Sequence, residues 1–328
     1  MKKFWLSFLA LATISLLATG CGGGGGGSDD DDVTPVAESG STGTGSGSSE
    51  SGSGSGNTSP SVPESFVLVP GATFDGTTAI TGSSVFISGR TITIPNLLAC
   101  DHEVTQAEYQ SVMLSNPSNF QDNPATGETQ ANRPVEYVSW YDAIMYCNKK
   151  SAQAGRTPCY KVNGNADTDQ WGYTPHAGNS ISGTITCDFN ANGYRLPTEA
   201  EWEYLARGGN LTNTNQTTYS GTGDIENLAW YTTNSGDKTH EVKKKNPNGK
   251  TLYDMSGNVW EWCWDWFSDT ITASTPPTGA ASGSIRGARG GSWRNNASLC
   301  AVSYRFNGAE PDYRNGGFGF RVVCSRSE

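Results

Sequence analysis

Cys300 and its neighbours are the first candidates for chemistry in this chain. Cys300 closes the segment RGGSWRNNASLC, residues 289–300, which holds a Gly-Gly-Ser-Trp turn and two asparagines. A cysteine in such a loop acts as a nucleophile or metal ligand when its thiolate forms beside a second reactive group. The available histidines, His102, His176 and His240, lie far apart and lack the paired spacing of a metal site. Two hypotheses stay open, a reactive cysteine or a scaffold for a surface that changes.

The segment DMSGNVWE, residues 254–261, is a second candidate. Calcium takes about six to eight oxygen ligands, and a turn can supply carboxylates and backbone carbonyls together. A structural calcium ion here would stiffen the loop beneath the C-terminal segment. The alternative is a plain turn before a buried strand that contains Trp260 and Trp262.

The elements that must position these two segments include three helices, which are predicted from their N-terminal capping signals. Thr105 with Glu108 forms a capping box before EYQSVM, and Thr198 with Glu201 forms another before a helix that ends at Gly208 and Gly209. The third helix starts at Ser139. In this helix, Asp142 lies near the positive end of the helix dipole, and the face predicted to be buried consists of Trp140, Ala143, Ile144 and Cys147.

Alternating β-branched residues predict strands in SFVLVPGATF and RTITIPNLLA, and long loops rich in Gly, Asn and Asp follow the helices. Short helices among loops and small sheets indicate an α+β fold. Residues 65–328 are long enough for a sizeable core and contain no second linker, so we expect one loop-rich globular domain.

The N-terminal region predicts export. Residues 1–20 combine two lysines, an apolar run and small residues before Cys21, which is typical of a lipoprotein signal peptide, and plain secretion is the alternative. Residues 21–64 are a Gly/Ser/Asp tether with almost no apolar surface. We expect lipidation of Cys21, a membrane anchor and an exported bacterial lipoprotein at the outer membrane or cell surface.

The net charge and the number of cysteines limit the class of binding partner and the possible disulfides. The net charge of −10 argues against nucleic-acid binding. With Cys21 lipidated, seven of the eight cysteines remain, an odd number that requires a free thiol or an intermolecular pair. Cys147 and Cys159 could pair, whereas Cys100, Cys263 and Cys324 stand in apolar contexts typical of buried thiols.

Four stretches together resemble the formylglycine-generating-enzyme, or sulfatase-modifying-factor, family. They are EVTQAEYQSVM, YRLPTEAEWEYLARGG, YDMSGNVWEWCWDW and RGGSW with the later GFGFRVV. The resemblance covers residues 65–328 and implies a C-type-lectin-like fold. Because the family contains oxidases, sulfur-transfer enzymes and binding proteins, the fold does not decide the function.

The resemblance also implies what the two candidate sites would do. The family's oxidases hold copper with two cysteines after the Gly-Gly-Ser turn, and the matching positions are Asn295 and Cys300. Since a neutral amide cannot replace a thiolate for Cu(I), we expect no copper or iron and no enzyme activity. The implied calcium ligands are the Asp254 and Glu261 side chains and the Gly257 and Val259 carbonyls.

The tail is similar to the variable region of proteins diversified by retroelements, which share this fold. In those proteins AAY codons become NNY codons, which never encode Lys, Gln, Glu, Met or Trp. Between Arg294 and Phe318 only Glu310 belongs to the excluded set. We place the variable region at residues 293–320, with exposed aromatic rings at Phe306, Tyr313 and Phe318. The candidate ligand-binding residues are Arg294, Asn295, Asn296, Leu299, Phe306, Asn307, Gly308, Ala309, Tyr313, Asn315, Gly316, Gly317 and Phe318.

These observations favour a non-enzymatic lipoprotein that binds an unknown protein or glycan, on another cell, through a diversified C-terminal site. Arg, Tyr and Phe provide anchoring contacts in such a site, and Asn and Gly provide adaptable ones. Two alternatives stay open. One is a metal-dependent oxidase with an altered active site, and the other is an invariant glycan- or protein-binding lipoprotein.

Overall fold

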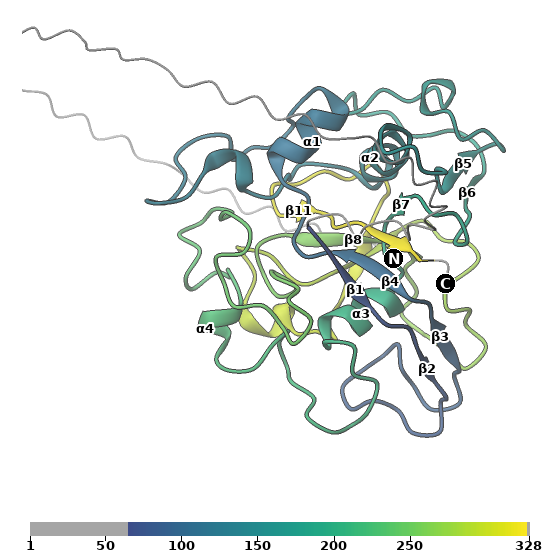
Figure 1. The fold of residues 1–328 in the computed structure, drawn as a ribbon, viewed down its shortest axis with the longest axis vertical. Coiled ribbons are helices and arrows are strands. Elements are labelled where there is room, and N and C mark those ends of the chain that lie inside the picture. Colours follow the sequence, from purple (N-terminus) through teal and green to yellow (C-terminus); the bar gives the residue numbers. More distant parts are fainter. Residues whose placement is uncertain (1–64, 327–328) are drawn as a thin grey trace, which may run out of the picture. The chain divides into compact units, whose positions relative to one another are not determined.

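The structure, a computed structural model, describes residues 65–326. The predicted signal peptide, the lipidation site Cys21 and the tether of residues 21–64 lie outside the described residues. Among the helices of residues 65–326, none is both long and apolar enough to cross a membrane. The described part contains helices, strands and long connecting loops (Figure 1).

A four-stranded antiparallel sheet brings together the two ends of the described chain. Its strands, in spatial order, are β1 (Phe66–Val69), β4 (Leu97–Cys100), β12 (Val323–Ser325) and β7 (Tyr194–Arg195). Every residue of β4 is buried. Leu98 and Cys100 pack into one hydrophobic cluster, and Leu97 and Ala99 pack into a second. Since successive side chains alternate between the faces of a strand, this sheet has a core on each side.

The second sheet carries both candidate sites. Its strands, in spatial order, are β10 (Arg305–Ala309), β9 (Arg286–Arg289), β8 (Trp260–Trp266) and β11 (Phe318–Gly319). Strand β11 pairs with β8 in parallel, and the other pairs are antiparallel. Strand β10 forms an edge, and its register shifts between Phe306 and Ala309. Two-stranded sheets join β2 (Ala72–Phe74) to β3 (Ile92–Ile94) and β5 (Tyr160–Val162) to β6 (Ile185–Cys187).

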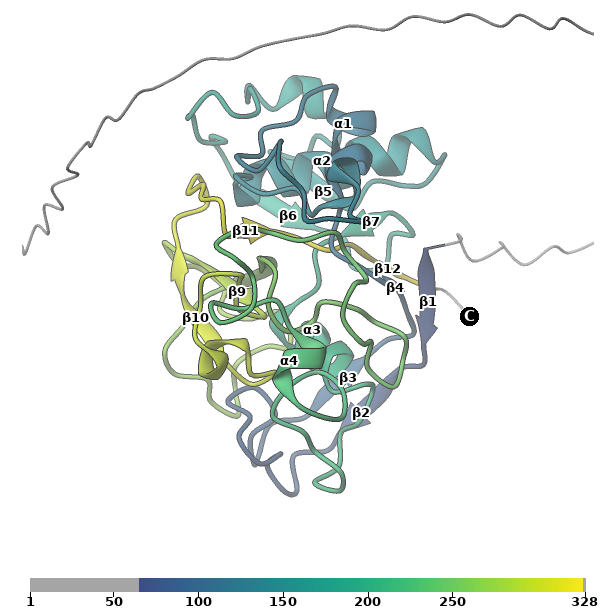
Figure 2. The same cartoon turned by 90° about the vertical axis from the view of Figure 1, so that its left-hand side faces the viewer.

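The helices begin where the capping residues predict. The α-helices are α1 (Gln106–Met113), α2 (Trp140–Gln153), α3 (Glu199–Ala206) and α4 (Ile225–Leu228), and the 3-10 helices are η1 (Gln130–Asn132), η2 (Thr168–Gln170) and η3 (Ala297–Cys300). Capping boxes at Thr105, Ser139 and Thr198 start α1, α2 and α3. In Figure 2, α1 and α2 lie on one side of the β4–β12 region and α3 lies on the other.

The predicted face of α2 is core. Trp140, Ala143, Ile144 and Cys147 are fully buried and belong to the first hydrophobic cluster, with Trp260 and Trp262 of β8. The second cluster contains Trp202 of α3. Trp140 and Trp262 each donate an indole N–H to a backbone carbonyl, which satisfies the polar atom of the buried ring.

The seven cysteines of the described part are all unpaired. The suggested Cys147–Cys159 disulfide does not form, and both thiols are buried. Cys100, Cys263 and Cys324 are buried as predicted.

Candidate functional site

Two arginines fix the C-terminal segment, residues 293–320, to the rest of the domain. Arg305 on β10 donates through Nε and Nη2 to Glu199 at the start of α3, at 2.8 and 2.5 Å. Arg314 donates through Nε to Asp142 on α2 at 2.9 Å and through Nη2 to the Tyr173 hydroxyl at 2.7 Å. The carboxylates of Glu199 and Asp142 are almost wholly buried. The backbone between the arginines is therefore held at both ends.

Trp293 supports the turn that leads into β11. Its indole N–H donates to the Gly316 carbonyl at 2.8 Å, and its half-buried ring packs edge-on against Phe120 at 5.2 Å. Figure 2 shows the yellow segment from η3 through β10 to the turn before β11 along one side of the described domain. The segment forms a face that rests on fixed side chains.

The predicted ligand-binding residues divide by exposure. Exposed members are Arg294, Asn296, Asn307 and Tyr313. Half-buried members are Asn295, Leu299, Phe306, Gly308 and Asn315. Buried members are Ala309, Gly316, Gly317 and Phe318. The segment therefore presents a mixed polar and aromatic surface from a subset of the predicted positions.

The prediction that Phe318 is an exposed ring is wrong. Phe318 is 2% exposed, and its ring lies 5.1 Å from Trp262, 5.3 Å from Phe306 and 5.4 Å from Tyr313. The physical reason is the parallel pairing of Phe318 with Trp260 of β8, which draws this end of the segment into the sheet. Phe318 therefore packs beneath the face and supports it, and we call it the floor residue.

Three glycines in the predicted set are also not open positions. Gly308 has a φ of 86°, and a Cβ there would lie 2.5 Å from the Ile285 side chain. A Cβ on Gly316 would lie 3.0 Å from Asn119, and one on Gly317 would lie 3.2 Å from Ser292. Side chains at these positions would need the neighbouring atoms to move, so we exclude the three from the accessible face.

Two tyrosines beside the face are missing from the predicted set. Tyr137, which precedes α2, is 41% exposed and donates its backbone N–H to the Asn315 carbonyl at 3.1 Å. Its φ of 64° is unusual for a bulky residue. Tyr304 is 37% exposed and lies against Trp260. Tyr304 could have been predicted as a member of the face because it lies within residues 293–320. No local signal in the sequence places Tyr137 beside Asn315.

Asn295 and Cys300 each have polar partners of their own. The Asn295 amide oxygen accepts a hydrogen bond from the Ser292 hydroxyl at 2.6 Å. The Cys300 thiol is buried beneath the backbone, where a Cβ on Gly291 would lie 2.6 Å from its sulfur. Burial raises the pKa of Cys300 to about 12, so its thiolate is scarce at neutral pH.

The predicted calcium residues lie around a buried turn. Asp254 has a φ of 55°, and its Oδ2 accepts from the Lys243 backbone N–H at 2.8 Å. Its Oδ1 is buried and has no hydrogen-bond partner among the described residues. Burial raises the pKa of Asp254 to about 6. An orphaned carboxylate oxygen of this kind fits a cation ligand.

The second carboxylate of that set is already paired. Glu261 accepts from Arg321 Nε and Nη2, both at 2.7 Å, and from the Trp202 indole N–H at 2.6 Å. The Val259 backbone N–H donates to the buried Glu103 carboxylate at 3.0 Å. Because Glu261 is paired with Arg321, Oδ1 of Asp254 is the one side-chain oxygen of the predicted calcium set that has no hydrogen-bond partner among the described residues. Calcium binding at Asp254, Gly257, Val259 and Glu261 stays a prediction.

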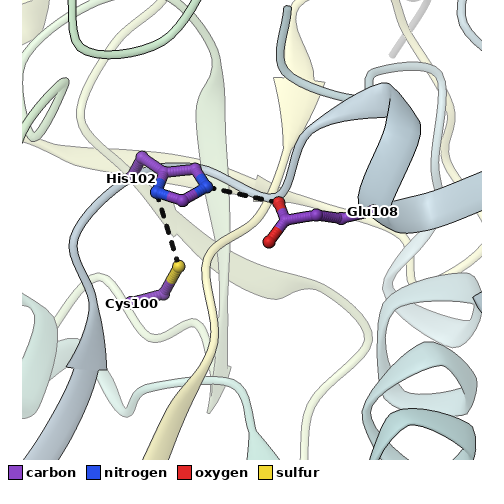
Figure 3. Close-up of side chains that lie close together, drawn as sticks. All are labelled: Cys100, His102 and Glu108. Carbon is purple, nitrogen blue, oxygen red and sulfur yellow. Dashed lines mark hydrogen bonds and ion pairs between the residues drawn. The ribbon is translucent and has the colours of Figure 1, made fainter. Parts of the chain in front are cut away.

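A further polar cluster, Cys100, His102 and Glu108, lies where β4 leads into α1 (Figure 3). His102 Nδ1 is 3.8 Å from the Cys100 sulfur and also contacts Asp101, while Nε2 is 3.3 Å from Glu108. Burial alone would lower the pKa of His102, but hydrogen bonds to Asp101, Cys100 and Glu108 raise it to about 12. The contact between His102 and Glu108 joins the segment after β4 to the first turn of α1.

The comparison with protein families identifies the domain. The family described as the sulfatase-modifying factor enzyme 1-like domain matches residues 53–326. The chain belongs to this family. The predicted family and the α+β, C-type-lectin-like fold are thereby confirmed.

Individual relatives extend this result. The chain is 36% identical over 288 residues to the chaperone protein LppX of Paenibacillus barcinonensis, which covers 81% of this chain and 91% of that protein. It is 40% identical over 147 residues to the formylglycine-generating enzyme of Streptomyces coelicolor, which covers 40% of this chain and 46% of the enzyme. The enzyme match thus spans under half of either protein.

Solved structures share the fold over most of the chain. Treponema denticola variable protein 1 is 42% identical with a TM-score of 0.70, and the match covers 80% of this chain and 95% of that one. The structure of CarF is 27% identical with a TM-score of 0.62, covering 81% of this chain and 100% of that one. The predicted resemblance to a variable protein is confirmed.

Proposed function

We propose that this protein is a non-enzymatic binding protein whose C-terminal face, diversified by a retroelement, contacts a protein or glycan ligand on another cell. The observation that carries the proposal is that residues 293–320 contain both buried anchoring residues and exposed residues. Arg305 and Arg314 are tied to buried carboxylates, whereas Arg294, Asn296, Asn307 and Tyr313 are exposed between or beside them. The similarity to variable protein 1 supports the same reading.

Such an arrangement suits variation. Exposed positions away from the core and from special backbone geometry usually change stability by about half a kcal/mol or less when substituted. The anchors, the floor residue Phe318 and the buried tryptophans of β8 keep the backbone in place while the outer side chains differ. Tyr and Phe side chains lose little conformational entropy on binding, because each has only two side-chain torsions.

The test exchanges the four exposed residues together. Arg294, Asn296, Asn307 and Tyr313 would be replaced by other NNY-encodable residues, and ligand capture and thermal unfolding would be measured on each variant. The proposal expects a folded protein with altered partners. Capture that is unchanged in several folded variants would remove this face from the binding site. Sequencing the gene tests diversification directly, because the proposal requires AAY-derived codons at these positions and a near-repeat of the segment nearby.

Anchoring is part of the proposal. We place the protein at the bacterial cell surface through a lipid on Cys21, because the tether that follows has no apolar face of its own. The Cys21→Ser variant should leave the membrane fraction. If this variant still partitions with the membranes into the detergent phase, the lipoprotein assignment is wrong.

The absence of an oxidase activity is proposed on the chemistry of two residues. Asn295 supplies an amide where copper needs a thiolate, and Cys300 is buried with a raised pKa. The purified protein should not convert the cysteine of a sulfatase-motif peptide to formylglycine, with or without added copper. Formylglycine detected by mass spectrometry would overturn this part.

An invariant protein-binding lipoprotein is the second candidate. The Paenibacillus relative, described as a chaperone, is the observation that favours it. A chaperone-type protein would bind unfolded clients and would show no AAY-derived codon clusters. Suppression of the aggregation of an unfolded test protein, together with an invariant gene, would support this second candidate over the first.

A further inference from the structure

A cavity of about 470 Å³ lies beside the second sheet, apart from the exposed residues of the C-terminal segment. Its walls come from α2, β6, β8, β9 and the loop of residues 278–281. The side chains that matter for its chemistry are Tyr141, Ile185, Phe189, Trp264, Trp266 and Arg286. We call this cavity the Arg286 pocket. Its volume is within the range of about 300–1,000 Å³ that small-molecule sites occupy.

Arg286 is a buried charge without a carboxylate partner. It is 2% exposed and makes no ion pair among the described residues, and its guanidinium lies over the rings of Trp140 at 3.7 Å and Trp266 at 3.4 Å. Buried charges are ordinarily paired. Asp265, which is near it in β8, instead accepts from the Glu199 backbone N–H at 2.9 Å. The two indole rings stabilise the cation but accept none of its N–H groups in the ring plane.

The unused donors lie on one edge of the guanidinium. Nη1 donates to the Trp264 carbonyl at 2.5 Å, Nε is buried without a partner, and Nη2 makes no hydrogen bond among the described residues. Arg305 and Arg321 use this same Nε–Nη2 edge to hold Glu199 and Glu261. That edge is the one with which arginine grips a carboxylate through two parallel hydrogen bonds.

Two other buried arginines show how partners compensate such a charge here, although Nε of Arg289 also lacks a hydrogen bond among the described residues. Arg90 also lacks a carboxylate partner, but its Nε, Nη1 and Nη2 each donate to a backbone carbonyl. Arg289 is as buried as Arg286, and its pairing with Glu203 and Glu199 outweighs burial and raises its pKa. In Arg286, burial dominates and lowers the pKa to about 9. Arg286 therefore combines a charge that is unpaired among the described residues with a place in a cavity wall.

The walls indicate what else the ligand carries. Trp264, Trp266 and Phe189 are half-buried aromatic rings, and Ile185 adds an aliphatic surface. Aromatic walls favour a flat or CH-rich ring. A single arginine supplies the charge for one carboxylate.

We propose that the Arg286 pocket binds a small molecule in which one carboxylate is attached to a ring. The carboxylate accepts a hydrogen bond from Nη2 of Arg286, and the ring lies between Trp264, Trp266 and Phe189. The proposed contact uses Nη2 alone, since Nε is buried. Two sources share this chemistry, an acidic sugar and an aromatic acid. No residue of the C-terminal segment, residues 293–320, lines this pocket, so its binding can be tested separately from that of the proposed C-terminal face.

The experiment titrates the full chain with matched probes and follows tryptophan fluorescence and calorimetry. Phenylacetate is paired with phenylacetamide, and glucuronate with glucose, so that each pair differs in charge and shares a ring. We expect at least one carboxylate to bind about tenfold or more tightly than its neutral partner. The pair that shows the preference identifies the source. Equal binding within both pairs, or no saturable binding by either carboxylate, would overturn the proposal.

Variants locate the binding. Arg286→Gln should abolish the preference for the carboxylate, whereas Lys161→Gln, which removes one charge from an exposed position of β5, should retain it. Since Arg286→Gln removes a buried side chain and can impair folding, Ala281→Phe provides a second measurement. Ala281 lines the pocket at an exposed position, so this variant should fold and exclude the probes. Unchanged carboxylate binding in folded Ala281→Phe protein would place the site elsewhere.

Discussion

The Arg314 guanidinium donates to Asp142 at 2.9 Å, across 172 positions of sequence. Asp142 is fully buried at the start of α2, where its carboxylate also accepts hydrogen bonds from the backbone N–H of the N-cap Ser139 and from the Tyr173 hydroxyl. One carboxylate thus starts a helix and fixes the C-terminal segment. Because Tyr313 is exposed directly beside Arg314, adjacent residues carry opposite roles, one in anchoring and one on the candidate binding face.

Arg314→Ala should lower the free energy of unfolding by about 2–4 kcal/mol. Removing one partner of a fully buried pair costs about 3–5 kcal/mol, and Arg314 keeps a little solvent exposure. Tyr313→Ala is the matched control and should change stability by about 0.5 kcal/mol or less. Chemical denaturation of both variants provides the measurement. Equal effects of the two substitutions would show that Arg314 is not an anchor.

Phe318→Ala should destabilise the protein by about 3–5 kcal/mol, as expected for an aromatic ring deleted from a core. Asn307→Ser, on the same segment but exposed, should have an effect near zero. Thermal and denaturant unfolding would measure both. If Phe318→Ala is as mild as Asn307→Ser, residue 318 belongs to the face after all and the burial of its ring is unimportant.

Glu136 should make stability depend on pH. Its Oε1 accepts from the Phe120 N–H at 2.8 Å, its Oε2 is buried without a partner, and burial raises its pKa to about 7. Between about pH 4.5 and 7 the folded protein keeps a proton that the unfolded chain releases, so this residue lowers stability progressively as pH rises through that window. It contributes no such loss below about pH 4.5.

Glu136→Gln should therefore stabilise the protein by about 1–3 kcal/mol at pH 8 and have almost no effect at pH 4. Glu310→Gln, at an exposed position, is the control and should show no such dependence. Denaturation curves across this pH range test the expectation. A destabilising effect of Glu136→Gln at pH 8 would contradict it.

Calcium removal should lower the melting temperature if the turn around Asp254 holds the ion. Binding to the folded state stabilises it by RT ln(1 + [L]/Kd), so the shift should grow with free calcium. Asp254→Ala should abolish the dependence, because Oδ1 of Asp254 is the open side-chain oxygen. Asp169→Asn, which changes an exposed carboxylate, should preserve it. Identical melting with calcium and with a chelator would leave this segment as a turn only.

Local rules in the sequence determined the helix starts and the α2 core face. The capping partners Thr105 and Glu108 are three residues apart, so their contact depends on backbone geometry that the sequence encodes directly. The buried face of α2 follows from the helical repeat in the same way. The motifs were also sufficient to predict the family and the α+β fold.

Only the tertiary structure decided which side chains of the C-terminal segment face outward. Phe318 is buried because β11 pairs with β8, and Glu261 is committed to Arg321, 60 residues away. Neither relationship leaves a local pattern, since each joins residues that are far apart in the sequence. Tyr313 and Arg314 are adjacent, and the sequence does not show which of them is anchored and which is exposed. Their roles follow from the position of a buried carboxylate on α2, which long-range packing sets.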